Sequence, residues 1–260
     1  MNRKLWIVFA VPCVLALCAV SVLPASGQMA EVKEKPPMYS YVGFWTIPRA
    51  QWGEMAKNDV ADQKILDKAM ANGTIVGYGN DLNLVHQLDG PTHDNWWSAT
   101  SMAGLLNVLD QFYKSGNATS PVLASATKHW DNITVSRHYN WHSGSWKDLY
   151  THGSSYKLKS SAPDDAIETL SKDMLVPLLE KQLADGTIHE YEIDTEAIHT
   201  DAPGTFWIFY LAANAEGLDK VSAAVRDALK ASPLNGSAFS SMSDSSEHRD
   251  YLVRTNATYK

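Results

Sequence analysis

The chain contains an internal repeat, and this repeat limits the folds available to it more than any other feature. The stretch ANGTIVGYGNDLNLVH, which begins at Ala71, returns as ADGTIHEYEIDTEAIH from Ala184. The two stretches stay 113 positions apart without a gap, and the same spacing pairs Gly104 with Gly217 further along. Self-similarity at a fixed spacing over such a length indicates a duplicated structural unit. We therefore expect two copies of one fold in a single chain.

Each copy contains the same order of predicted elements. Alternating apolar residues predict strands, and apolar residues spaced by three and four predict helices. The second copy follows the order of the first from residue 154, with a polar stretch at 231–246 that we expect to be a flexible loop. The unit is therefore β-α-β-β-α-β, the ferredoxin-like motif. In the first copy the predicted elements are a strand at 38–46, a helix at 49–70, a bent strand at 74–88, a strand at 94–101, a helix around 105–112 and a strand at 132–141.

The helices of a ferredoxin-like unit cover one face of its sheet, so the other face needs a covering partner. Two copies in one chain can place their open faces together. We predict an α+β fold with ferredoxin-like repeats at residues 38–150 and 151–260. Their antiparallel sheets are expected to pack face to face, so that the chain forms a pseudo-dimer with itself.

The order strand–helix–DGTI–strand, followed by GTFWIFYLAANAEGLDKV, resembles the dimeric α+β barrel superfamily, which includes antibiotic-biosynthesis monooxygenase-like and NIPSNAP-like domains. The resemblance covers about residues 38–259 and rests on pattern and element order, without a diagnostic motif. In that superfamily two chains usually form the barrel, and the duplication implies that one chain supplies both halves here. The resemblance implies oxidation of small aromatic molecules, haem binding or degradation, or no enzymatic activity, because a fold alone fixes no function.

The N-terminal segment predicts export. Two basic residues precede a long uncharged apolar run, and small residues follow it in PASG. We expect a signal peptide at residues 1–27 and a linker at 28–37. A retained membrane anchor is the rival interpretation, since the apolar run is nearly long enough to span a bilayer. Pro12 and the small residues after the run favour cleavage.

The composition of the chain bears on its cellular compartment and on the partners it can bind. Both cysteines lie in the expected signal peptide, so the mature chain has no disulfide, thiol nucleophile or cysteine–metal site. The glycosylation sequon at Asn132 falls in a predicted strand, which suits a bacterial protein exported to the periplasm or beyond. Without Arg3 and Lys4 the net charge falls from −7 to −9. An acidic chain with no basic stripe excludes nucleic acid as a partner.

The space between the two sheets is the expected ligand pocket. In the strand at 38–46, Tyr39, Tyr41 and Trp45 share one face, and we assign that face to the pocket because the smaller aliphatic face suits helix packing. The alternative is that these rings belong to an ordinary apolar core.

The segment HDNWWS contains two further candidates. Trp96 and Trp97 point to opposite faces of their strand, and the repeat pairs them with Phe209 and Tyr210. One tryptophan packs under helices and the other faces the inter-sheet space, but the sequence does not say which. The predicted ligand contacts are Tyr39, Tyr41, Trp45, Trp96, Trp97 and Tyr210.

Three histidines are candidates for catalysis. His86 and His199 are repeat equivalents, and histidine titrates near neutral pH. The alternative for both is a hydrogen-bonded position inherited from the ancestral unit. His138 precedes His142 by four residues, but on a strand this spacing separates the side chains by roughly 13 Å, too far to share one ion. We therefore predict no metal site.

These observations leave two function hypotheses. The first is an exported binding or accessory protein without a cofactor, which holds a small apolar or aromatic ligand between its sheets. The alternative, which the resemblance implies, is a cofactor-independent monooxygenase or a haem-handling enzyme. An enzyme needs a titratable group facing the pocket, with His86, His138 and His199 as candidates, whereas a binding module needs only an aromatic lining. We expect a monomeric pseudo-dimer or a homodimer, with no membrane contact after cleavage.

Overall fold

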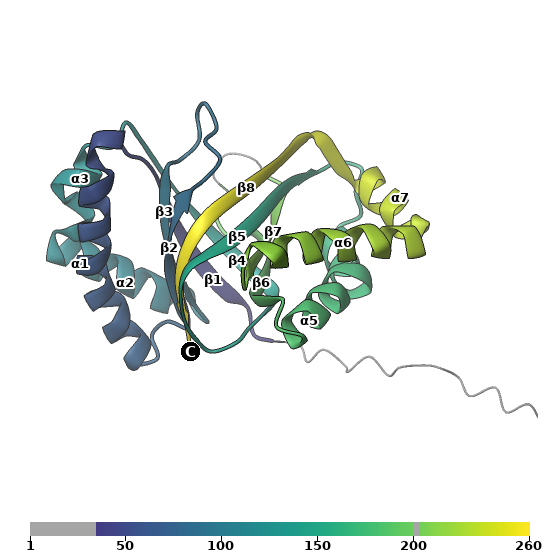
Figure 1. Cartoon of the computed structure of the whole chain (residues 1–260), viewed down its shortest axis with the longest axis horizontal. Coiled ribbons are helices and arrows are strands. Elements are labelled where there is room, and N and C mark those ends of the chain that lie inside the picture. Colours follow the sequence, from purple (N-terminus) through teal and green to yellow (C-terminus); the bar gives the residue numbers. More distant parts are fainter. Residues whose placement is uncertain (1–34, 200–202) are drawn as a thin grey trace, which may run out of the picture. The chain divides into compact units, whose positions relative to one another are not determined.

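The computed structural model of the chain describes residues 35–199 and 203–260. The eight strands in these residues form one closed antiparallel barrel, in the order β1-β3-β2-β8-β5-β7-β6-β4 (Figure 1). The expected signal peptide at 1–27 and most of the expected linker at 28–37 lie outside the described residues. In the described part of the chain, no helix has the length and apolar character needed to cross a membrane.

The elements follow the predicted order in both halves. The first four strands are β1 (Met38–Thr46), β2 (Gly77–Asn83), β3 (His93–Ala99) and β4 (Lys128–Trp141). The last four are β5 (Gly144–Leu158), β6 (Ile188–Glu196), β7 (Thr205–Ala212) and β8 (Ser243–Tyr259). The helices are α1 (Trp52–Ala71), α2 (Met102–Ser115), α3 (Pro121–Ala124), α4 (Ala166–Leu170), α5 (Val176–Ala184), α6 (Ala215–Ala231) and α7 (Pro233–Met242).

The barrel is consistent with two ferredoxin-like halves fused in one chain. Within the halves the strand orders are β4-β1-β3-β2 and β8-β5-β7-β6, which are equivalent. The predicted face-to-face sheets are joined at both edges into one barrel, because β2 pairs with β8 and β4 pairs with β6. Each free sheet edge therefore finds hydrogen-bond partners on the other half, and closure removes exposed edges altogether.

Glycines that the sequence repeat pairs have the same local structure in both halves. Gly73 and Gly186 follow α1 and α5 with φ of 76° and 75°, a left-handed conformation that glycine adopts at low cost. Gly104 and Gly217 lie in the first turns of α2 and α6, where an added Cβ would approach the backbone oxygen of Thr74 or Thr187 to 2.7 or 2.8 Å. The duplicated glycines therefore mark a helix end and a close helix–strand contact in each half.

Two predicted elements differ from the structure. The expected strand at 74–88 is shorter, since β2 ends at Asn83 and a loop follows with Leu88 fully exposed. The expected loop at 231–246 instead forms α7 and the start of β8. Phe239 of α7 stacks edge-on against Tyr156, at 4.9 Å between ring centroids. Phe239 therefore anchors α7 to the core, and the sequence of this helix has no apolar periodicity that would predict it.

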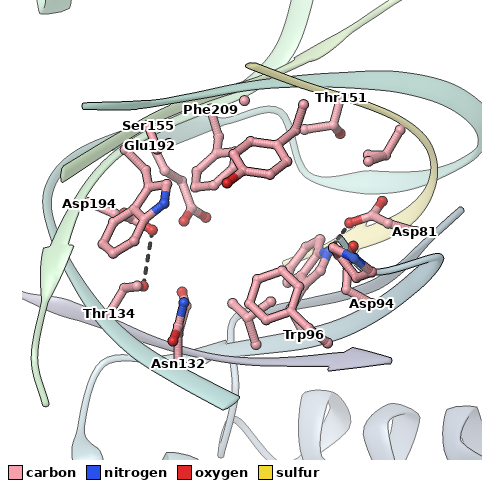
Figure 2. Close-up of a pocket in the computed structure, with 18 of the residues that line it drawn as sticks. Asp81, Asp94, Trp96, Asn132, Thr134, Thr151, Ser155, Glu192, Asp194 and Phe209 are labelled. Carbon is pink, nitrogen blue, oxygen red and sulfur yellow. Dashed lines mark hydrogen bonds between the residues drawn. The ribbon is translucent and has the colours of Figure 1, made fainter. Parts of the chain in front are cut away.

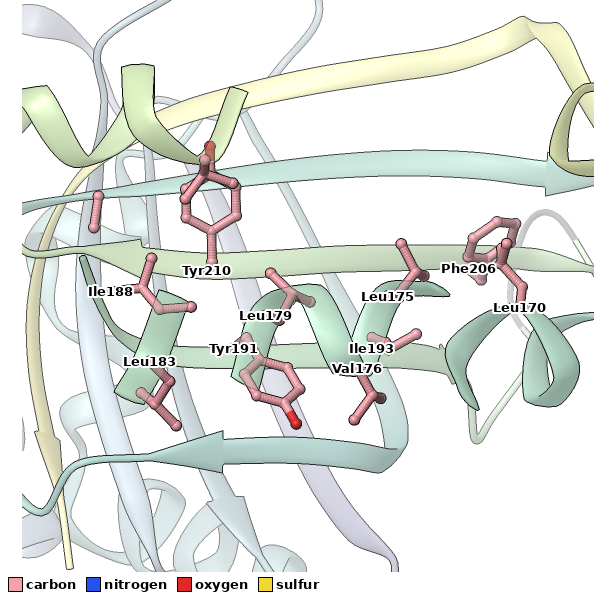
Figure 3. Close-up of a cluster of buried hydrophobic side chains, with 12 residues drawn as sticks. Leu170, Leu175, Val176, Leu179, Leu183, Ile188, Tyr191, Ile193, Phe206 and Tyr210 are labelled. Carbon is pink, nitrogen blue, oxygen red and sulfur yellow. The ribbon is translucent and has the colours of Figure 1, made fainter. Parts of the chain in front are cut away.

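The hydrophobic core lies outside the barrel, between its wall and the surrounding helices. In the second half, apolar side chains of α5, β6 and β7 interlock, and Ile188 and Tyr191 are almost completely buried (Figure 3). The first half has an equivalent cluster that includes Tyr41, Trp97 and Leu105. Since successive strand residues point to opposite faces, the residues between these core positions face the barrel interior.

Candidate functional site

The barrel interior contains a cavity of about 430 Å³, and every strand contributes to its lining. Its inward positions alternate with the outward core positions along each strand, as β geometry requires. In β1 the inward residues are Ser40, Val42 and Phe44. These side chains leave the middle of the barrel unfilled, so the interior can hold a small ligand.

Aromatic side chains form much of the cavity wall. They come from both halves of the barrel, and most of them are only partly buried. Tyr259 is 5% exposed and contacts Trp96, Trp141 and Trp146, of which only Trp96 lines the cavity. The aromatic residues that line the cavity are Phe44, Trp96, Trp130, Trp207, Phe209, Tyr251 and Tyr259.

Carboxylates form the other part of the lining. No lysine, arginine or histidine is among the described residues that line the cavity. Figure 2 shows Glu192 and Asp194 on one side of the cavity and Asp81 and Asp94 on the other. The barrel therefore encloses acidic groups, with no basic side chain among the described lining residues, within aromatic walls. The inward carboxylates of the strands are Asp81, Asp94, Glu190, Glu192, Asp194 and Glu196.

Asp81 and Asp94 form a buried pair on neighbouring strands, opposite each other in the β2–β3 register. The Trp96 indole Nε1 donates to Asp81 Oδ2 at 3.2 Å, and the Asn83 amide donates to Asp94 Oδ2 at 3.3 Å. Burial raises the pKa of Asp94 well above its usual range, and the nearby charge of Asp81 raises it further. Two carboxyl groups this close cannot both ionise easily, so the pair holds a proton.

Asp194 lies on the other wall, where two hydroxyl groups orient it. Thr134 Oγ1 donates to Asp194 Oδ2 at 3.0 Å, and Ser136 Oγ donates to Oδ1. Burial raises the pKa of Asp194 to about 6, although both hydroxyl groups favour its charged form. A carboxyl group with this pKa can accept or release a proton near neutral pH.

Glu190 and Glu192 precede Asp194 on the same face of β6. Burial raises the pKa of both glutamates well above the usual range, and the charge of Asp194 adds to this effect. Glu190 is only 3% exposed, and its Oε1 has no hydrogen-bond partner among the described residues. A buried, unpaired carboxyl oxygen is costly unless a ligand or a proton satisfies it.

The structure separates the two tryptophans of HDNWWS. Trp96 faces the cavity, whereas Trp97 stacks on Tyr41 at 4.3 Å and donates its Nε1 to the backbone oxygen of Leu105 at 3.1 Å. Tyr210, the repeat equivalent of Trp97, belongs to the outer core of the second half. Of the predicted contacts in this strand and its counterpart, only Trp96 lines the cavity.

The predicted orientation of β1 is wrong. Tyr39 and Tyr41 pack against the core under α1 and α2, and Trp45 packs beside Ile47 and Met55 on the outside. The space between the barrel wall and the helices is wide enough for whole aromatic rings, and the smaller side chains of the opposite face point inward. In β1 the face with the larger side chains is therefore covered by helices, and the face with the smaller side chains lines the cavity.

The three candidate histidines lie away from the cavity lining. His86 is exposed in the β2–β3 loop near Trp52, and His199 is exposed after β6. His138 lies on the outer face of β4, with its Nε2 2.9 Å from Glu168 Oε2.

The inward carboxylates were not identified from the sequence, although the segment EYEIDTE contains a signal for them. Its acidic residues recur at every second position, which places Glu190, Glu192, Asp194 and Glu196 on one face of the strand.

The donor groups do not suit a metal or haem in this cavity. Among the described residues, no three histidine, cysteine or acidic side chains come together in an arrangement that could hold a metal ion. A haem would meet carboxylates that repel its propionates, and no described histidine lines the cavity to bind its iron. The haem expectation therefore does not fit this lining.

Comparison with known proteins identifies the architecture. No family model and no curated protein matches the chain. A solved structure of a proposed monooxygenase from Lactobacillus acidophilus does match, with a TM-score of 0.63 at 11% identity over 86% of this chain and 97% of that chain. This chain has the dimeric α+β barrel fold.

Two further structures share the dimeric α+β barrel fold with the chain. A proposed monooxygenase from Fusobacterium nucleatum has a TM-score of 0.64 at 10% identity, over 86% of this chain and 94% of that chain. A proposed chlorite dismutase has a TM-score of 0.52 at 10% identity, over 85% of this chain and 95% of that chain. At these identities the likeness shows the barrel fold and leaves the activity unassigned.

Proposed function

We propose that this dimeric α+β barrel is a binding protein that holds a small molecule with an aromatic or apolar body inside its cavity. The observation that carries the proposal is the aromatic-walled cavity of about 430 Å³. Small-molecule sites generally occupy roughly 300–1,000 Å³ and combine apolar walls with a few polar groups. Trp96, Trp207 and Phe209 supply flat faces for such a body, and the hydroxyl and carboxyl groups supply orientation.

A fluorescent probe tests this proposal directly. N-phenyl-1-naphthylamine is uncharged, and its emission rises when it enters an apolar site. We expect saturable binding to the native protein and its loss in Val42→Trp, because Val42 lines the cavity and a larger ring would fill it. Val225→Trp is the matched control, since Val225 is 38% exposed on α6. Equal binding to native protein and Val42→Trp would refute binding inside the barrel.

A second candidate function is cofactor-independent oxidation of an aromatic substrate. It is favoured by Asp194, an inward carboxyl group with a pKa of about 6, and by the barrel fold shared with proposed monooxygenases. Asp194 would accept a phenolic proton from a hydroquinone, and the resulting anion would pass two electrons to dissolved oxygen. The substrate would become a quinone, and the oxygen would take up both protons and become hydrogen peroxide. Oxygen uptake with hydroquinones tests this reaction. Asp194→Asn should lower kcat by about a hundredfold, and absence of uptake by the native protein would discard the candidate.

We also propose that the barrel acts outside the cytoplasm, in the periplasm or beyond, and as a monomer or homodimer. The N-terminal sequence at 1–27 supports export, and closure of the barrel within one chain supports a monomer. Cell fractionation with mass spectrometry of the mature N-terminus tests the first statement. Light scattering of the purified mature protein tests the second.

A further inference from the structure

We infer that the ligand of this barrel is an organic cation, with an ammonium group attached to an aromatic or apolar body. This inference rests on the proposed binding function and specifies the ligand class. It follows from three features of the cavity: the sign of its charge, the position of the carboxylates on opposing walls, and the aromatic ring beside each of two β6 carboxylates.

The charge of the lining is unbalanced. Six strand carboxylates face inward, and the described lining residues supply no cationic side chain. Glu190 is the group with the clearest need for a ligand, because it is 97% buried and its Oε1 has no hydrogen-bond partner among the described residues. A cationic donor in the cavity would satisfy this oxygen and offset the repulsion between the neighbouring carboxylates.

The carboxylates lie on two walls that face each other across the barrel. β6 carries Glu190, Glu192 and Asp194, and β2 and β3 carry Asp81 and Asp94. In the closed order of eight strands, β6 and β2 are four strands apart in either direction, so they are diametrically opposite. Figure 2 shows the two acidic groups on opposite sides of the same space. A cation between them is attracted from both walls.

Aromatic rings flank the carboxylates of β6. In the β6–β7 register Asp194 lies opposite Trp207, and Glu192 lies opposite Phe209. Both rings line the cavity. An ammonium group gains both from a carboxylate and from the face of an aromatic ring within about 6 Å. The pairing of carboxylates with aromatic rings on β6 and β7 therefore suits an organic ammonium.

Three indoles with the same ring test the inference. Tryptamine carries an ammonium group, tryptophol carries a neutral hydroxyl in its place, and indole-3-acetate carries a carboxylate. Isothermal calorimetry at pH 8 should give tryptamine at least a tenfold lower Kd than tryptophol, and no binding of indole-3-acetate. Glu190→Gln should reduce the preference for tryptamine over tryptophol at least threefold. Glu54→Gln is the matched control, because Glu54 is an exposed residue of α1 outside the cavity.

The outcomes separate this inference from the proposed function. If tryptophol binds as tightly as tryptamine, or if the probe N-phenyl-1-naphthylamine binds and tryptamine does not, the ligand is not a cation and the binding function stands. If neither the probe nor any of the three indoles binds, the proposed function fails and the inference fails with it. Thermal unfolding of Glu190→Gln without ligand checks its fold, and we expect no loss of stability because the substitution removes an unpaired buried carboxyl group.

Discussion

Asp81 and Asp194 lie 113 residues apart, occupy equivalent positions in the two repeats, and face each other across the barrel from β2 and β6. They are 8% and 2% exposed. Each takes its hydrogen bonds from neighbouring side chains, Asp81 from Trp96 and Asp194 from Thr134 and Ser136. The duplicated unit therefore places a carboxyl group on both walls, and the protonation of these groups should govern stability and binding.

The first prediction concerns stability and pH. Burial raises the pKa of Asp194 to about 6, above the ordinary value of 3.8. Between about pH 4 and pH 6 the native state therefore binds more protons at this site than the unfolded state, and its contribution to stability decreases as pH rises. The loss is on the order of 3 kcal/mol. Asp194→Asn, which stays neutral, should be more stable than the native protein at pH 8, with the difference vanishing near pH 4.

Urea unfolding of both proteins from pH 4 to pH 8 measures this difference. Asp244→Asn serves as the control, because hydrogen bonds from Ser246 lower the pKa of Asp244 rather than raise it. A constant difference between Asp194→Asn and native protein across the range would show that Asp194 is already ionised at pH 4.

The second prediction is that tryptamine binding strengthens as pH rises. The cation needs ionised carboxylates, so its Kd should fall at least tenfold from pH 5 to pH 8, while that of neutral tryptophol stays constant. Asp89 at the cavity rim is 2.7 Å from Lys128, whose ammonium lowers the pKa of this carboxyl, so Asp89 stays charged throughout. A pH-independent Kd for tryptamine contradicts the prediction. The other titratable groups that face the cavity are Asp81, Asp94, Glu190, Glu192, Asp194, Glu196, Tyr251 and Tyr259.

The order of strands and helices could be predicted because each element has a local pattern of apolar residues. The repeat then predicted two ferredoxin-like halves with the same order. Barrel closure was not predictable in this way, since it depends on hydrogen bonds between β2 and β8 and between β4 and β6, which are far apart in the sequence. The expected inward face of β1 is the outward one, because side-chain size alone does not distinguish a face covered by helices from a face that lines a cavity. Alternating acids in EYEIDTE were the better signal, since a strand covered by helices outside can place carboxylates only inward.

The third prediction contrasts a closely packed glycine, Gly217, with a glycine in open space, Gly53. A Cβ on Gly217 would lie 2.8 Å from the backbone oxygen of Thr187, so Gly217→Ala must shift α6 or β6. We expect it to destabilise the fold by about 1–3 kcal/mol. Gly53 of α1 has open space around its Cβ position, so Gly53→Ala should instead stabilise the fold by up to about 1 kcal/mol. Urea unfolding of both variants measures the two effects, and equal effects would contradict the close contact.

The last prediction separates the two tryptophans of HDNWWS. Trp97 is 3% exposed and stacks on Tyr41 in the outer core, so Trp97→Ala should cost about 3–5 kcal/mol. Trp96 faces the cavity, so Trp96→Phe should change stability by less than about 2 kcal/mol and weaken ligand binding instead, because it loses the indole face and the hydrogen bond to Asp81.

Thermal unfolding and probe titration of both variants measure this separation. Trp97→Phe is the matched control for the second position, since it keeps an aromatic ring in the core and leaves the cavity lining unchanged. Its probe affinity should equal that of the native protein, whereas that of Trp96→Phe should fall several-fold. Equal affinities for both phenylalanine variants would mean that Trp96 does not contact the ligand, and the binding site would then have to lie along the Trp207 and Phe209 wall.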